Sequence, residues 1–93
     1  MIKINPKGQK AWVNFSFMPE HKSDEVVLSA DFNGWEKEPM KSKKDGSFYI
    51  RKYLPVGESY EFRYLVDNQQ WENEPNTRLV NNSFGSQNSL LEL

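Results

Sequence analysis

Apolar and polar residues alternate one by one along much of this chain, and this alternation limits the folds that it can adopt. In the segment 10–18 one face carries Ala11, Val13, Phe15 and Phe17, and the other carries Trp12, Asn14 and Ser16. In the segment 59–66 one face carries Tyr60, Phe62, Tyr64 and Val66, and the other carries Glu61, Arg63 and Leu65. A period of two residues is that of a β-strand with one buried face. No segment keeps a helical period, so we expect an all-β protein.

Turn-forming residues separate the apolar segments at intervals of about ten residues. The expected strands cover 10–18, 26–30, 48–54, 59–66 and 88–93, with Gly, Asn, Asp or Pro residues between them. The polar segment 69–82 contains Pro75 and four asparagines, and we expect an ordered loop there. This spacing predicts an antiparallel β-sandwich. The 93 residues are enough for one domain, residues 1–93, with one two-layer core.

Composition excludes several classes of function. The formal net charge is −1, whereas a nucleic-acid-binding domain would be expected to show a basic face. The one basic cluster, Lys41-Ser42-Lys43-Lys44, precedes the turn residues Asp45-Gly46 and is typical of a solvated hairpin. The absence of cysteine excludes disulfide bonds and thiolate metal sites. No apolar stretch suits a signal peptide or a membrane span. We therefore expect a cytoplasmic protein that binds neither nucleic acid nor membrane.

The side chains of a catalytic centre are also missing. The lone histidine, His21, belongs to the charged segment 19–24, where a surface histidine is far more common than a general base. One histidine without cysteine cannot supply the nitrogen and sulfur ligands of a zinc site. The acidic pairs Glu36/Glu38 and Glu72/Glu74 lie in polar segments and indicate solvated charge rather than glycosidase carboxylates. We expect no enzymatic activity, no cofactor and no metal.

Two tryptophans adjoin turn residues rather than apolar runs. Trp35 ends the segment Asp31-Phe32-Asn33-Gly34-Trp35, and Trp71 follows Val66-Asp67 after a few polar residues. A core position and an exposed platform for a flat ligand are equally consistent with that context. For Trp12 and Phe32 we expect core positions, with packing at a sheet edge as the alternative for Trp12.

Other polar and aromatic residues are expected near Trp71. Arg63 points outward if Tyr60, Phe62 and Tyr64 fill the core, and the short turn after this strand can bring Trp71 toward its guanidinium. Phe84-Gly85-Ser86 and Asn88 add an exposed aromatic with polar neighbours.

An ordered series of motifs resembles a known family. The series is Val27-Leu28-Ser29-Ala30-Asp31-Phe32-Asn33-Gly34-Trp35, Gly46-Ser47-Phe48, Leu54-Pro55-Val56-Gly57, Tyr60-Glu61-Phe62-Arg63-Tyr64-Leu65-Val66-Asp67, Trp71, Glu74-Pro75 and Phe84-Gly85-Ser86-Gln87-Asn88. It is similar to the family 48 carbohydrate-binding modules, which include the glycogen-binding domain of the AMP-activated kinase beta subunit and the N-terminal early-set domain of isoamylase and branching enzymes. The resemblance covers about Val13 to Leu93.

The resemblance implies an immunoglobulin-like β-sandwich that binds α-1,4-linked glucans. Trp35 and Trp71 match the two tryptophans on which glucose rings stack. Arg63 matches a lysine of the family, and it keeps the charge while adding a planar donor fork. Phe84 matches a leucine that contacts the sugar chain, and Ser86 and Asn88 match a hydrogen-bonding threonine and asparagine.

The chain departs from the family pattern before Trp71. Val66-Asp67-Asn68-Gln69-Gln70 replaces a common Val-Asp-Gly and is one residue longer. Asn68 tolerates a positive φ, so a tight turn can still form.

We expect non-catalytic α-glucan binding, with a glucan-metabolising enzyme as a further partner. The alternative is a protein-interaction domain of the same fold that has no affinity for sugar.

Overall fold

The computed structural model describes residues 1–93, and nearly all of its regular structure is β-strand. The strands are β1 (Ile2–Lys7), β2 (Lys10–Phe17), β3 (Val26–Ala30), β4 (Glu38–Pro39), β5 (Lys41–Ser42), β6 (Phe48–Pro55), β7 (Ser59–Val66), β8 (Gln70–Glu72), β9 (Leu79–Asn81) and β10 (Gln87–Glu92). One short 3-10 turn, η1 (Asp31–Asn33), follows β3. The five strands expected from the alternation agree with β2, β3, β6, β7 and β10 to within one residue at each end.

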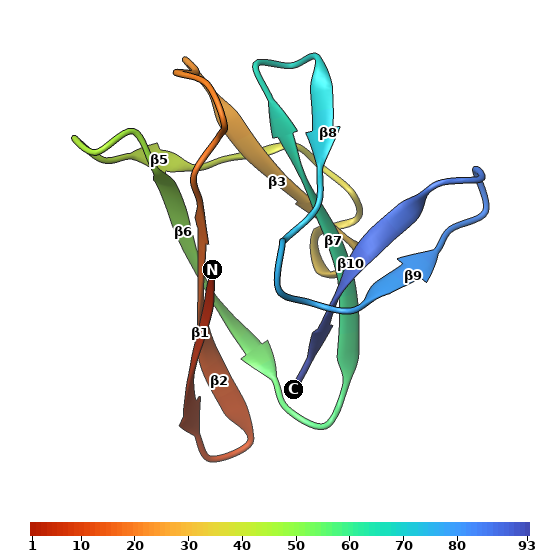
Figure 1. The fold of residues 1–93 in the computed structure, drawn as a ribbon. Helices are drawn as coiled ribbons and strands as arrows, with labels where there is room; N and C mark the ends of the chain where they lie inside the picture. The colour runs from red at the N-terminus through yellow and green to blue at the C-terminus, as the bar shows by residue number, and fades with distance from the viewer.

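The strands form two antiparallel sheets. One sheet has the order β1-β2-β6-β5, and the other has the order β4-β3-β7-β10-β9, with β8 also paired to β7. Figure 1 shows the first sheet on one side of the molecule and the second sheet, with the β7–β8 and β9–β10 hairpins, on the other. The all-β antiparallel sandwich predicted from the sequence is confirmed.

The core lies between the inward faces that the alternation identified. Val13, Phe15 and Phe17 of β2 are buried against Phe62 and Tyr64 of β7. The Phe15 and Phe62 rings meet edge to face at 5.2 Å between centroids, and Phe17 and Tyr64 lie 4.5 Å apart. Aromatic pairs of this kind add to the apolar area that each ring buries.

Three local expectations were wrong or incomplete. Trp12 is not in the core: it lies on the outward face of β2, half-exposed, with its ring 4.7 Å from that of Tyr53. The alternation had already placed it on the face opposite to that of Val13, and there its ring packs against a cross-strand aromatic ring.

The segment 69–82 is not simply a loop, because it contains β8 and β9. Strand β1 was not expected at all; its residues are mostly exposed, so no burial pattern marks it. Phe32 packs against the core cluster, as expected.

A buried polar cluster ties the segment after β8 to the core. The Tyr64 hydroxyl donates a hydrogen bond of 2.8 Å to Glu74 Oε1, and Ser89 Oγ accepts one of the same length from the Glu74 amide. Burial and then the adjacent Glu74 carboxylate raise the pKa of Tyr64 well above its usual value, so this hydroxyl remains a donor. The Glu74 side chain is thus held inside the sandwich, and the chain leaves β8 in a defined direction.

Candidate functional site

The turn after β3 places Trp35 at the surface of the six-stranded sheet. Gly34 and Trp35 both have positive φ, 70° and 62°, and the Trp35 amide donates to the Ala30 carbonyl at 2.8 Å. The Ser29 hydroxyl donates to the Trp35 carbonyl at 2.9 Å, and Asn33 Oδ1 accepts from the Ala30 amide at 3.2 Å. The motif that stood out in the sequence is therefore a tight reversal that closes on β3, with the indole left 44% exposed.

The β7–β8 hairpin places Trp71 beside Arg63. Trp71 pairs with Leu65 across the two strands, and the Arg63 guanidinium lies over the indole, 5.0 Å from the ring centroid. The turn between the strands puts Asp67 and Asn68 in the left-handed region, with φ of 50° and 55°. The longer, glycine-free turn is therefore formed, and the expected approach of Trp71 to Arg63 is confirmed.

Two side-chain contacts fix that hairpin to its neighbours. Asp67 Oδ1 accepts hydrogen bonds from the amides of Asp24 and Glu25, at 2.8 and 2.9 Å. Lys37 Nζ donates to Asn68 Oδ1 at 3.2 Å, which connects the chain after Trp35 to the turn before Trp71. The two tryptophan-bearing segments thus support each other through polar contacts.

Asn82 organises the loop between β9 and β10. Its Oδ1 accepts from the amides of Phe84 and Ser86, at 2.9 and 3.2 Å. Its Nδ2 donates to Ser86 Oγ at 2.9 Å and to Asn88 Oδ1 at 3.2 Å. Phe84 projects from the loop and is 92% exposed. One amide side chain therefore satisfies the loop backbone and orients the two polar residues beside it.

These three segments line one groove of about 720 Å³ on the outer face of the six-stranded sheet. Five of the six predicted site residues line it, namely Trp35, Arg63, Trp71, Phe84 and Asn88. Ser86 is not part of the lining, but its hydroxyl accepts from Arg63 Nη1 at 3.3 Å. Asn88 is buried, and its Nδ2 donates to Glu61 Oε1 at 3.0 Å.

The groove also contains residues that sequence reasoning missed. The further lining residues are Ser29, Asp31, Lys37, Glu61, Asn81, Asn82 and Ser83. Glu61 could have been found, because it lies two residues before Arg63 on the same strand face. Asn82 and Lys37 carry no comparable signal, since only the folded loops bring them to the groove.

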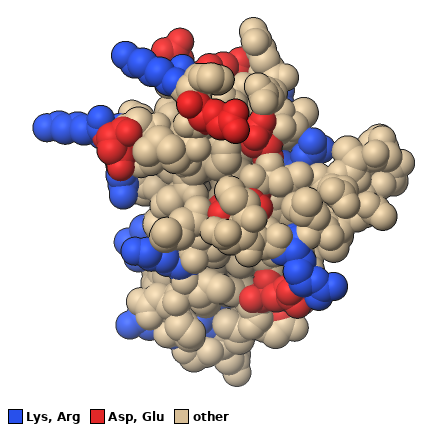
Figure 2. Space-filling view, viewed as in Figure 1, with Lys and Arg blue, Asp and Glu red and all other residues tan.

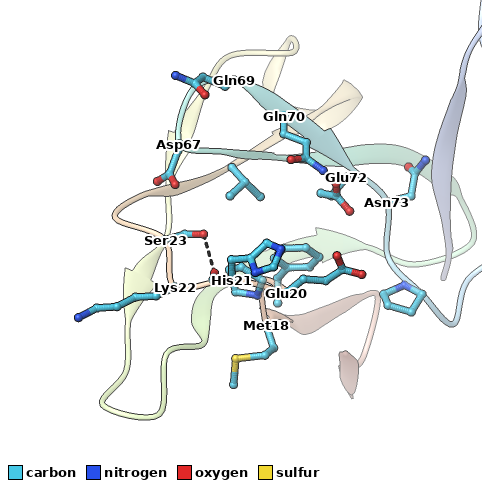
Figure 3. A pocket seen from close by; sticks show the side chains of 14 residues that line it. Met18, Glu20, His21, Lys22, Ser23, Asp67, Gln69, Gln70, Glu72 and Asn73 are labelled. Carbon is cyan, nitrogen blue, oxygen red and sulfur yellow. Dashed lines mark hydrogen bonds between the residues drawn. The ribbon is translucent and has the colours of Figure 1, made fainter.

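A second hollow, of about 310 Å³, lies on the other side of β8 (Figure 3). Gln70 and Glu72 point into it from β8, facing Glu20 and His21 of the loop after β2. It offers no exposed aromatic platform, because Phe17, which lines it, is buried in the core. No group of three His, Asp or Glu side chains suited to a metal ion is present, and no helix has the length and apolarity of a membrane span.

An antiparallel sandwich whose groove combines indoles, a guanidinium and amides is typical of a carbohydrate-binding module. The family described as the glycogen recognition site of AMP-activated protein kinase matches residues 13–93. Because this match covers most of the chain, the chain belongs to that family of glycogen recognition domains.

Similar curated proteins agree with this assignment. 5'-AMP-activated protein kinase subunit beta-1 of Sus scrofa is 33% identical over 69 residues, which make up 74% of this chain and 54% of that sequence. The corresponding subunits of Rattus norvegicus and Homo sapiens are 32% identical over 69 residues, 74% of this chain and 24% of theirs. The chain therefore spans between about half and a quarter of the length of these relatives.

Proposed function

We propose that this chain binds α-1,4-glucans of the glycogen or starch type by stacking glucose rings on Trp35 and Trp71. The observation that carries the proposal is that two half-exposed indoles, from segments far apart in the chain, line one polar groove. A glucose ring presents C–H groups on its faces and hydroxyls at its rim, so it needs an apolar platform with donors and acceptors around it.

Arg63 supplies the donors. The guanidinium lies over the Trp71 indole, 5.0 Å from the ring centroid, and this contact restricts its position at the groove. Its Nε is buried and Nη1 donates to Ser86 Oγ, so the terminal N–H groups not engaged by Ser86 are the donors for sugar hydroxyls. Phe84 adds apolar contact from the opposite rim of the groove. Ser86 and Asn88, which hydrogen bonds from Asn82 orient, supply hydrogen-bonding groups for sugar hydroxyls.

Binding of a short glucan is expected to be weak. The groove is open, and two stacking contacts with a few solvent-exposed hydrogen bonds must offset the freedom lost on association. A polymer with many equivalent sugar units raises the apparent affinity by presenting repeated sites. Glycogen is therefore a better first probe than a free oligosaccharide.

Affinity electrophoresis in gels containing glycogen tests the proposal. The wild type should be retarded, and Trp35→Ala and Trp71→Ala should migrate nearly as they do without glycogen. Trp12→Ala is the matched control, because Trp12 is exposed to a similar extent but lies on the other sheet. Retardation that is absent in the wild type, or lost equally in the Trp12 variant, would refute the proposal.

A specific observation also favours a protein contact at the edge of this groove. Phe84 is almost fully exposed at the tip of a loop, and aromatic residues are enriched where proteins meet. The named relatives are subunits of a kinase, so we propose a protein partner, such as a glucan-metabolising enzyme, as the second candidate. If glycogen fails to retard the chain while Phe84→Ala abolishes co-purification of a defined partner, the protein-interaction function is the better account.

A further inference from the structure

Charge is divided between the two sheets. Strands β1, β2, β5 and β6 contain six cationic residues, Lys3, Lys7, Lys10, Lys41, Arg51 and Lys52, and no Asp or Glu. The strands of the other sheet contain four acidic residues, Glu38, Glu61, Glu72 and Glu92, and one cation, Arg63. In Figure 2, most Lys and Arg side chains project from the side of the molecule where the four-stranded sheet lies. The net charge of −1 therefore conceals a basic face that composition alone does not reveal.

Five of these cations lack a carboxylate partner. Lys52 is paired with Glu38, and the other two salt bridges of the structure involve Met1 and Arg78. The register places Lys7 directly opposite Lys10, and like charges facing each other across strands destabilise a sheet. Lys3, Lys10 and Arg51 lie on the same outward face as Trp12, because the strand register places each of them an even number of positions from it. The face thus holds unneutralised positive charge in fixed register.

Aromatic rings on this face hold two of the cations in place. The Arg51 guanidinium lies 4.7 Å from the Trp12 ring centroid, Trp12 stacks on Tyr53 at 4.7 Å, and Lys10 Nζ lies 5.1 Å from the Tyr53 ring centroid. These four side chains, Lys10, Tyr53, Trp12 and Arg51, form what we call the cation–aromatic column. A long cationic side chain that already rests on a ring loses less freedom when it binds an anion. Arg51 also keeps the N–H groups in its plane free for a two-pronged contact with a carboxylate.

We propose that the outer face of the β1-β2-β6-β5 sheet is a docking surface for an acidic, extended segment of a partner protein. A row of Asp or Glu side chains would complement this face, because its strands carry positive charge and no carboxylate of their own. The column also holds two of the cations in place before binding. The surface lies on the opposite side of the sandwich from the glucan groove, so both can be occupied at once. This inference stands independently of the proposed glucan binding.

The same features argue against other polyanions. Single-stranded nucleic acid needs free ring faces on which bases stack, but the rings of Trp12 and Tyr53 are flanked by each other and by the two cations. Stable attachment to an anionic bilayer draws on apolar side chains that enter the lipid, whereas the indole and phenol here pack against each other between two cationic side chains.

Fluorescence anisotropy with a labelled oligoglutamate peptide tests the inference on the 93-residue chain. We expect saturable binding at low ionic strength that weakens as salt screens the contact. Lys10→Gln/Arg51→Gln should weaken binding at least about fivefold. Lys22→Gln/Arg78→Gln removes the same charge outside this sheet and should leave binding within about twofold of the wild type.

Two further experiments test whether the aromatic rings contribute beyond the charge of the face, and which class of anionic ligand binds. Trp12→Leu keeps every cation but removes the ring beneath Arg51, and it should weaken binding by a smaller but measurable factor while thermal unfolding reports whether the variant is folded. An oligothymidylate and vesicles containing phosphatidylserine are titrated in parallel. The proposal would be overturned if the two double variants lost affinity for the peptide equally, or if the wild type did not bind the peptide at all. Tighter binding of the oligonucleotide or of the vesicles than of the peptide would also overturn it. Glycogen retention of Lys10→Gln/Arg51→Gln should match that of the wild type.

Discussion

Among single residues, Trp35 is unusual because a residue with a large side chain has a left-handed backbone conformation. Its φ is 62°, and this region costs an L-residue roughly 1–2 kcal/mol. Hydrogen bonds from the Trp35 amide to Ala30 and from Ser29 to the Trp35 carbonyl hold the conformation. Strain retained by surrounding structure is typical of functional positions. We therefore interpret the indole at this position as kept for binding rather than for stability.

Small replacements at Trp35 test that interpretation. Glycine adopts positive φ without the steric cost that alanine meets, so Trp35→Gly should be more stable than Trp35→Ala by about 0.5–1 kcal/mol. Urea unfolding of the two variants measures the difference, and both should lose glycogen retention. If the alanine variant is as stable as the glycine variant, the backbone at this position is not strained.

At the scale of elements, each tryptophan depends on the loop or hairpin that presents it, and Phe84 depends on Asn82. The Asn82 carboxamide makes four side-chain hydrogen bonds within the β9–β10 loop and to Asn88. Its oxygen serves the loop backbone, and its nitrogen serves the side chains of Ser86 and Asn88. The two ends of the carboxamide therefore have separable roles.

Substitutions at Asn82 can separate those roles. Asn82→Asp keeps an acceptor for the amides of Phe84 and Ser86 but loses the donor to Asn88, so it should weaken glycogen binding while the loop stays ordered. Asn82→Ala loses both and should weaken binding further, with a stability loss of about 1–2 kcal/mol. Glycogen affinity gels and amide hydrogen exchange at Phe84 and Ser86 measure the two effects. Equal exchange rates in the two variants would show that the carboxamide oxygen does not order the loop.

Alternation predicts the strands that have one buried face, such as β2 and β7, because every second residue of such a strand must be apolar. Strand β1 is exposed at a sheet edge, and β8 and β9 are three residues long, so neither burial nor length marks them. The ordered motifs located five of the residues that line the groove, and the alternation of β7 correctly directed Arg63 outward. Lys37 and Asn82 escaped prediction because loop conformation, rather than periodicity, brings them to the site.

At the scale of the whole molecule, a hydrogen bond between Tyr64 and Glu74 joins the core to the segment that connects β8 and β9. Burial and the Glu74 carboxylate raise the pKa of Tyr64 above 10.0, the value for an unperturbed tyrosine. Below pH 10 the hydroxyl is protonated in both the folded and the unfolded chain, and its contribution to stability is fully present. Above pH 10 the unfolded chain loses this proton first, so the contribution falls as the pH rises toward the folded pKa.

Tyr64→Phe tests this linkage. Near neutral pH the variant should be less stable by about 1–3 kcal/mol, because the buried Glu74 carboxylate loses a donor. Above pH 10 the wild type should lose stability more steeply than the variant, by up to about 1.4 kcal/mol per pH unit, so the difference between them narrows. Urea unfolding at neutral and alkaline pH measures both quantities. Parallel stability curves would contradict the assignment of the raised pKa to Tyr64.

Trp35 and Trp71 are proposed to form the glucan platform together, and the third tryptophan, Trp12, gives an internal comparison because it lies on the opposite sheet. Each indole N–H gives its own proton–nitrogen signal, so a titration with maltoheptaose followed by NMR reports on all three rings in one sample. The Trp35 and Trp71 signals should move along the same saturation curve while the Trp12 signal stays in place. Movement of the Trp12 signal along that curve, or of only one of the other two signals, would show that Trp35 and Trp71 do not form the glucan platform together.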